Sequence, residues 1–122
     1  MGNRWILIAG DILVFVIFSI LGRGAHQMEL GAAGIVSTGW PFLAGWLIVG
    51  IPMGVYRPEA YESAAAGAKR ALLTWIIGGP VALVLRSLAV GRLPHWSFAI
   101  IAFTTSLVLL VAWRALYGSL KR

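Results

Sequence analysis

The stretch WILIAGDILVFVIFSILG, residues 5–22, decides the fold class of this chain, because Asp11 is its single charged residue. A membrane-spanning helix needs about 20 mainly apolar residues. A secretory signal peptide would have an uncharged apolar core and a small-residue cleavage site after it. The acid inside this run, and the lack of such a site before Arg23, argue against a signal peptide. We therefore predict a retained transmembrane helix over residues 5–22.

The composition extends this prediction to the whole chain. Of its 122 residues 60% are hydrophobic and 11% are charged, whereas a soluble domain is about 45–50% apolar and about 25% charged. So few charges do not cover a water-facing surface. The sequence contains no cysteine, which excludes disulfides and thiolate metal sites. We predict an all-α integral membrane protein.

The length allows at most four membrane spans with short connections, since each span takes about 20 residues. The remaining apolar runs supply the other three spans. Together they make residues 1–122 a single four-helix transmembrane domain. The three further helices are predicted over residues 39–56, 69–90 and 95–117.

The start of the second helix has two interpretations. Thr38 is a plausible N-cap that places Pro41 in the first helical turn, where a missing N–H costs little. Residues 30–37 would then form a re-entrant or interfacial turn. The alternative is one longer helix kinked at Pro41. We favour the first interpretation, and we assign the polar residues 57–68 to the loop before the third helix.

Basic residues predict the orientation in the membrane. With four spans, both termini and the 57–68 loop lie on one side, and interfacial aromatic residues agree with this, since Trp5, Tyr56, Trp113 and Tyr117 fall at one level. The positive-inside rule then places both termini in the cytoplasm of a multi-pass protein of the cell membrane. The net charge of +6 is explained by orientation, so no nucleic-acid partner is expected. That side collects Arg4, Arg57, Lys69, Arg70, Arg114, Lys121 and Arg122, and the other side Arg23, Arg86 and Arg92.

Asp11 is the most unusual residue, because it lies ~9 Å past Trp5 along the first helix at 1.5 Å per residue. An acid at such depth costs ~2.5–3.5 kcal/mol on insertion scales and normally has a partner. The fourth helix returns to the same side, and Arg114 lies ~5 Å before Tyr117. We predict an Asp11–Arg114 ion pair. It either fixes the helix register, which we favour, or makes Asp11 the carrier of a proton or cation relay.

A second polar group lies on the opposite side of the membrane. Its net positive charge suits an anionic ligand, a lipid headgroup or a carboxylate of a partner protein. The simpler interpretation is that Arg23 and Arg92 snorkel to lipid phosphates while Glu29 neutralises Arg86. No spacing motif joins the two histidines with Glu29, so neither a metal nor a cofactor is expected. This outer cluster contains Arg23, His26, Glu29, Arg86, Arg92 and His95.

Gly78, Gly79 and Pro80 lie at the midpoint of the third helix. Pro80 lacks its N–H and clashes with the carbonyl four residues back, which frees the Ile76 carbonyl. Helices broken in this way at mid-bilayer form substrate sites in transporters. The predicted midplane break at Gly78–Pro80 therefore has a functional interpretation. The alternative, which is the commoner case, is a simple kink that lets the helix wrap around its neighbours.

These residues together resemble a known family. The pattern is Gly10-Asp11, Phe15, Gly22-Arg23-x-x-His26, Trp40-Pro41-Phe42-x-x-Gly45-Trp46, Arg86 and Trp113-Arg114. It resembles the small prokaryotic membrane family called domain of unknown function 3054, over nearly the whole chain. The resemblance implies a four-helix membrane protein without an assigned activity, substrate or cofactor. It also implies that Asp11, Arg23, His26, Pro41, Trp46, Arg86 and Arg114 belong to the family pattern.

Two functions follow as hypotheses. The first is a non-enzymatic structural or accessory component of a membrane assembly, whose partners are the lipid bilayer and either other membrane subunits or further copies of the chain. The second is a small oligomeric transporter or channel for a solute, ion or proton, using Asp11, the outer cluster and the Gly78–Pro80 break. A lipid-modifying enzyme comes third, because the sequence offers no nucleophile and no paired carboxylates. We expect no enzymatic activity.

Overall fold

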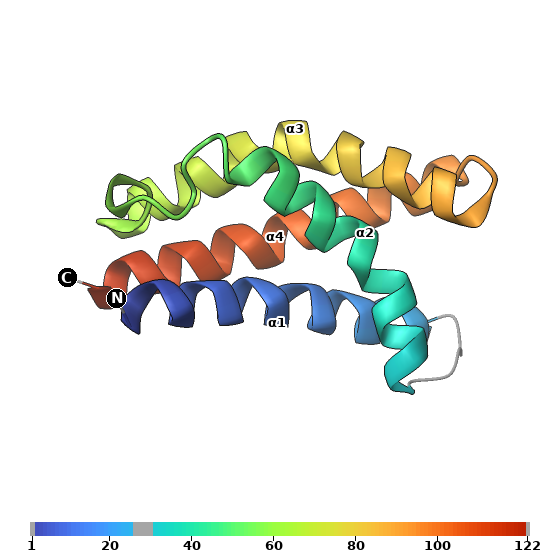
Figure 1. Ribbon diagram of the computed structural model, residues 1–122, viewed down its shortest axis with the longest axis horizontal. Helices are drawn as coiled ribbons and strands as arrows, with labels where there is room; N and C mark the ends of the chain where they lie inside the picture. The colour runs from blue at the N-terminus through green and yellow to red at the C-terminus, as the bar shows by residue number, and fades with distance from the viewer. Residues whose placement is uncertain (1, 26–30, 122) are drawn as a thin grey trace.

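The computed structural model describes residues 2–25 and 31–121, and it confirms the all-helical fold class. Four of its helices are long and apolar enough to cross a membrane. The ends of α1 and α4 that carry the two termini lie together at one end of the bundle (Figure 1). The helices are α1 (Gly2–Ala25), α2 (Ala32–Gly50), α3 (Ala64–Val90) and α4 (Trp96–Lys121), with a short 3-10 helix η1 (Pro58–Tyr61) before α3.

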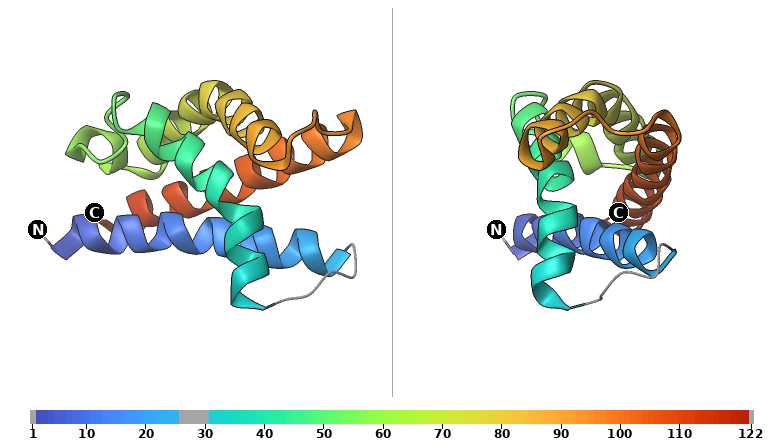
Figure 2. Two further views of the ribbon diagram at one scale, coloured as in Figure 1. Left: turned by 45° about the vertical axis from the view of Figure 1, so that its right-hand side comes forward. Right: turned by 90° about the vertical axis from the view of Figure 1, so that its right-hand side faces the viewer.

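The four helices form a ring in chain order. Each packs against its neighbours, α1 on α2, α2 on α3, α3 on α4 and α4 on α1, as the end-on view in Figure 2 shows. Large side chains fill the centre of this ring, among them Phe15, Trp46 and Trp75, all nearly inaccessible. The Phe15 and Trp75 ring centroids lie 5.6 Å apart and so join α1 to α3 across the centre.

The start of α2 differs from the favoured prediction. The helix begins at Ala32, after the N-cap Gly31, and contains Pro41 in its interior. Its ribbon changes direction along its length (Figure 1). The separate turn over residues 30–37 and the N-cap at Thr38 were therefore wrong, with residue 30 itself outside the described residues. The alternative of one longer helix through Pro41 is the one that the structure supports.

Contacts with α1 explain why α2 tolerates an internal proline. The Arg23 Nη1 donates a hydrogen bond to the Thr38 Oγ1 at 2.9 Å. Gly39 lets the two backbones approach, since a Cβ there would lie 3.2 Å from the Phe15 carbonyl oxygen. A helix interior proline removes one backbone hydrogen bond and strains the preceding turn. These tertiary contacts stabilise the helical turns before Pro41, which the local sequence around Pro41 alone does not predict.

The end of α2 also lies earlier than residue 56. The helix stops at Gly50, and residues 51–56 form turns that include Gly54 at a φ of +77°. A positive φ suits glycine because it has no Cβ. This turn brings Val55 into the protein interior, where it has 0% exposure. The predicted span over 39–56 was thus displaced at both ends.

α3 begins at Ala64, inside the predicted 57–68 loop. Ser63 caps it, because its Oγ accepts a hydrogen bond from the Ala66 backbone N–H at 3.1 Å. Serine at this position satisfies a backbone donor that the helix leaves open. α3 ends at Val90, and Gly91 after it has a φ of +87°, the left-handed C-cap typical of glycine. The ends of α1 and α4 differ from the predicted bounds by only a few residues.

α3 is continuous from Ala64 to Val90, so the predicted break at Gly78, Gly79 and Pro80 was wrong, and the alternative of a helix that passes through Pro80 is the one that the structure supports. The two glycines serve as close packing positions. A Cβ at Gly78 would lie 3.2 Å from the Gly45 carbonyl oxygen of α2, and one at Gly79 would overlap the Phe103 ring of α4. Small residues allow this close approach of membrane helices. Packing on both sides therefore holds the helix together through Pro80.

Candidate functional site

An ion pair between α1 and α4 occupies the interior of the bundle. The Arg114 Nη2 lies 2.8 Å from the Asp11 Oδ2, and the Arg114 Nε donates to the Asp11 Oδ1 at 3.1 Å. Two parallel contacts of this kind are the strong, orientation-specific form of an arginine–carboxylate pair. The exposed fractions of Asp11 and Arg114 are 0% and 1%. The ion pair that the helix depths predicted is present.

Three further side chains donate to the same carboxylate. The indole Nε1 of Trp46, on α2, donates to the Asp11 Oδ2 at 3.1 Å. The Tyr56 hydroxyl, in the turn after α2, donates to the Oδ2 at 2.5 Å. The Trp113 Nε1, on α4, donates to the Oδ1 at 3.0 Å. We call the set of Asp11, Trp46, Tyr56, Trp113 and Arg114 the Asp11 network.

The Arg114 guanidinium is enclosed as completely as the carboxylate. Its Nη1 donates to the Val55 carbonyl oxygen at 2.7 Å, which ties the turn after α2 to α4. Its Cζ lies 5.1 Å from the Trp46 ring centroid and 5.2 Å from that of Tyr56. A cation within about 6 Å of an aromatic face is attracted to it. The Asp11 network thus joins α1, α2, the 51–56 turn and α4.

Glycines beside the network let its members reach one another. Gly10 precedes Asp11, and a Cβ there would overlap the Trp113 ring. Gly67 of α3 lies against the backbone of α4, where a Cβ would overlap the Arg114 carbonyl oxygen. The first glycine makes room for the indole that donates to Asp11. The second brings α3 against the turn of α4 that carries the arginine.

The network is electrically neutral, and the acceptor sites of the Asp11 carboxylate are occupied. A carboxylate offers about four lone-pair sites, and Asp11 accepts five contacts from protein donors. A substrate or a proton would have to displace one of these donors in order to reach an Asp11 oxygen. The arrangement is well suited to holding helices together and poorly suited to exchanging a ligand.

The structure distributes the outer cluster over different neighbours. Arg23 contacts Thr38 of α2, and the Arg86 Cζ lies 4.0 Å from the Phe98 ring centroid of α4. The His95 Nδ1 lies 2.8 Å from the Ser97 Oγ. His26 and Glu29 lie outside the described residues, so pairing of Glu29 with Arg86 stays a prediction. Among residues 2–25 and 31–121, no group of three His, Cys, Asp or Glu side chains lies close enough to hold a metal ion.

The aromatic donors of the network were not predicted. The sequence placed Tyr56 and Trp113 among the interfacial aromatic residues, whereas both side chains donate to Asp11. Trp5, in contrast, is 69% exposed. A signal was available: an indole N–H deep in a membrane helix needs an acceptor, and Asp11 was the one acid at that depth.

Four long apolar helices around a buried, hydrogen-bonded ion pair define a small multi-pass membrane protein. The chain belongs to the family described as protein of unknown function (DUF3054), whose family model matches residues 8–117. This match confirms the resemblance drawn from the sequence and spans the whole Asp11 network. Neither the curated proteins nor the solved structures contain a match to this chain.

Proposed function

We propose that the protein is a non-enzymatic structural or accessory component of a membrane assembly, and that the Asp11 network fixes its helices in register. The observation that carries this proposal is the saturation of the Asp11 carboxylate by five donor contacts. A proton or cation carrier needs an oxygen that is open to its cargo. The same saturation weighs against the transporter hypothesis, which relied on Asp11 as that carrier.

The outer surface supports a role among other membrane components. Large apolar side chains are exposed on every helix, including Ile12 of α1, Ile48 of α2, Ile77 of α3 and Ile101 of α4. In a membrane such surfaces contact lipid tails or the helices of other proteins. The proposed partners are the bilayer and either other membrane subunits or further copies of this chain.

Purification at native expression tests the assembly. The tagged chain, extracted in a mild detergent, is expected to elute in a particle much larger than its 13.1 kDa mass, with a constant set of membrane subunits. Deleting the chain is expected to lower the abundance of those subunits. Proton or cation flux through liposomes that hold only the purified chain would contradict the proposal. The flux counts against the proposal when it vanishes in Asp11→Asn and persists in the matched exposed variant Glu59→Gln, because it then depends on Asp11 itself.

We also propose that both termini face the cytoplasm from the cell membrane. The ends of α1 and α4 share one end of the bundle with the start of α3 (Figure 1). Arg57 directly precedes η1, and Lys69 and Arg70 lie in the second turn of α3. The excess of basic residues on this side of the membrane persists when Arg114, which is buried, is left out of the comparison. A fluorescent reporter that folds only in the cytoplasm, fused after Arg122, is expected to be bright. A dark fusion with an active periplasmic reporter at the same position would reverse the orientation.

A further inference from the structure

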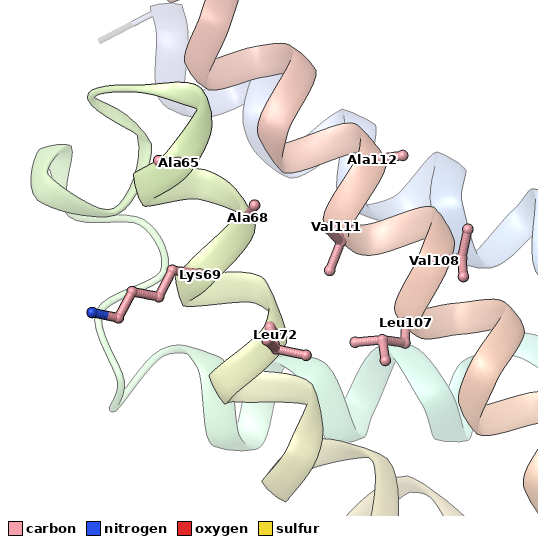
Figure 3. Close-up of a pocket in the computed structure, with 8 residues that line it drawn as sticks. All are labelled: Ala65, Ala68, Lys69, Leu72, Leu107, Val108, Val111 and Ala112. Carbon is pink, nitrogen blue, oxygen red and sulfur yellow. The ribbon is translucent and has the colours of Figure 1, made fainter.

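An apolar groove runs between α3 and α4 on the outside of the bundle. It has a volume of about 700 Å³ and is open to the surroundings. Its walls include Ala68 and Leu72 of α3 and Leu107 and Val111 of α4, as the close-up in Figure 3 shows. Because the Ala68 side chain is short, the side chains of α3 and α4 leave the space between the two helices unfilled.

Lys69 is the one charged residue that lines this groove. In Figure 3 its side chain extends away from α4, toward the chain that precedes α3. There it also lines a second hollow of about 460 Å³, together with Arg70 and Glu59. Lys69 is exposed, and within the described residues it has no hydrogen bond or ion pair. Its stem thus borders apolar space while its ammonium group lies beside polar space.

The depth of Lys69 suits the membrane interface. α3 has 27 residues and is therefore about 40 Å long, against about 30 Å for the hydrocarbon core. Lys69 lies about 7.5 Å from the start of the helix, at the level where phospholipid phosphates meet the acyl chains. The apolar groove continues from this level toward the bilayer centre.

We propose that this face is a binding site for an anionic phospholipid. One acyl chain lies in the α3–α4 groove, the phosphate contacts the Lys69 ammonium, and the rest of the headgroup covers the second hollow. Charge selects the anionic class: Lys69 and Arg70 against Glu59 leave one positive charge in excess, which a singly negative headgroup neutralises and a zwitterionic one does not.

Charge also disfavours a second copy of the chain as the occupant of the groove. Two parallel copies related by a two-fold axis along the membrane normal, and packed through this groove, would each place Lys69, which lines it, at the edge of the shared interface. Like charges at short distance are repulsive, most of all near a low-dielectric medium. A phospholipid brings the opposite charge to the same position and supplies an acyl chain of suitable chemistry for the apolar walls.

Native mass spectrometry of the purified full chain tests the site. The protein is incubated with equal amounts of phosphatidylglycerol and phosphatidylcholine that carry identical acyl chains. The wild type is expected to retain phosphatidylglycerol in preference. Lys69→Gln is expected to lower the ratio of the two bound lipids about fivefold, in line with the contribution of one basic residue near a lipid phosphate.

Two matched controls distinguish binding at this site from a general attraction of anionic lipids to the basic end of the bundle. Arg57→Gln removes an exposed cation at the same end of the bundle but outside both hollows, and it is expected to leave the ratio unchanged. Val108→Phe fills the groove and is expected to lower retention of both lipids, whereas Val84→Phe, exposed on α3 outside it, is not. Equal retention of the two lipids by the wild type would overturn the proposal. So would equal losses in Lys69→Gln and Arg57→Gln, or a dimer that Val108→Phe dissociates.

Discussion

Arg114→Met is expected to lower the free energy of unfolding by about 3–5 kcal/mol, the usual loss when one partner of a buried ion pair is removed. Methionine fills much of the space of the arginine, so cavity formation is a minor part of this loss. The larger part comes from Asp11, which stays at 0% exposure without its counter-charge. Reversible unfolding in mixed detergent micelles, followed by the tryptophan signal, measures the change.

The double variant Asp11→Leu with Arg114→Met is expected to regain most of that stability. Removing both charges also removes the desolvation that the pair has to overcome. A residual deficit is expected because the Trp46, Tyr56 and Trp113 donors lose their acceptor. Arg92→Met, at an exposed position, serves as the control and is expected to change stability by less than about 0.5 kcal/mol.

Two results would contradict this account of the pair. A double variant no more stable than Arg114→Met alone would mean that the unpaired charge of Asp11 is not what destabilises the single variant. A double variant that folds normally yet fails to join its membrane assembly would show that the pair does more than hold the helices. The second result would return Asp11 and Arg114 to a direct functional role.

The fold class and the central ion pair were both predictable, for the same physical reason. Hydrocarbon excludes charge, so long runs without it mark the helices, and a lone acid within such a run requires a partner. The rise of 1.5 Å per residue then places Asp11 and Arg114 at one depth. Counting residues from the helix ends was sufficient, because helices that cross a membrane begin near its two interfaces.

The direction of side chains and the helix ends were less predictable, because they depend on neighbouring helices. Hydropathy does not say which face of α4 carries Trp113, so an interfacial position and a contact with Asp11 looked alike. The local signals at Thr38 and Pro41 suggested a helix start, but Gly39 and Arg23 anchor an earlier turn on α1. Gly78 and Gly79 suggested a break by their local propensity and prove to be contact positions.

Gly67→Ala is expected to destabilise the protein by about 1–3 kcal/mol, the usual cost of overpacking, although alanine is the better helix former. The added methyl would overlap the Arg114 carbonyl oxygen. That atom belongs to the backbone of α4, so it yields only if α3 and α4 separate. Because the same turn of α4 carries Arg114, the separation also disturbs the contacts on Asp11. The micelle unfolding measurement reports the loss.

Gly22→Ala is the matched control, because it makes the same change in α1 at a position where a Cβ meets nothing within 4 Å. There the helix propensity of alanine acts alone, and stability is expected to rise by up to about 1 kcal/mol. The two substitutions therefore differ in sign. If Gly67→Ala raised stability as Gly22→Ala does, α3 would not lie against the Arg114 turn. The position of the Arg114 turn would then be set without α3, and the groove between α3 and α4 would have to be wider than it is in the structure.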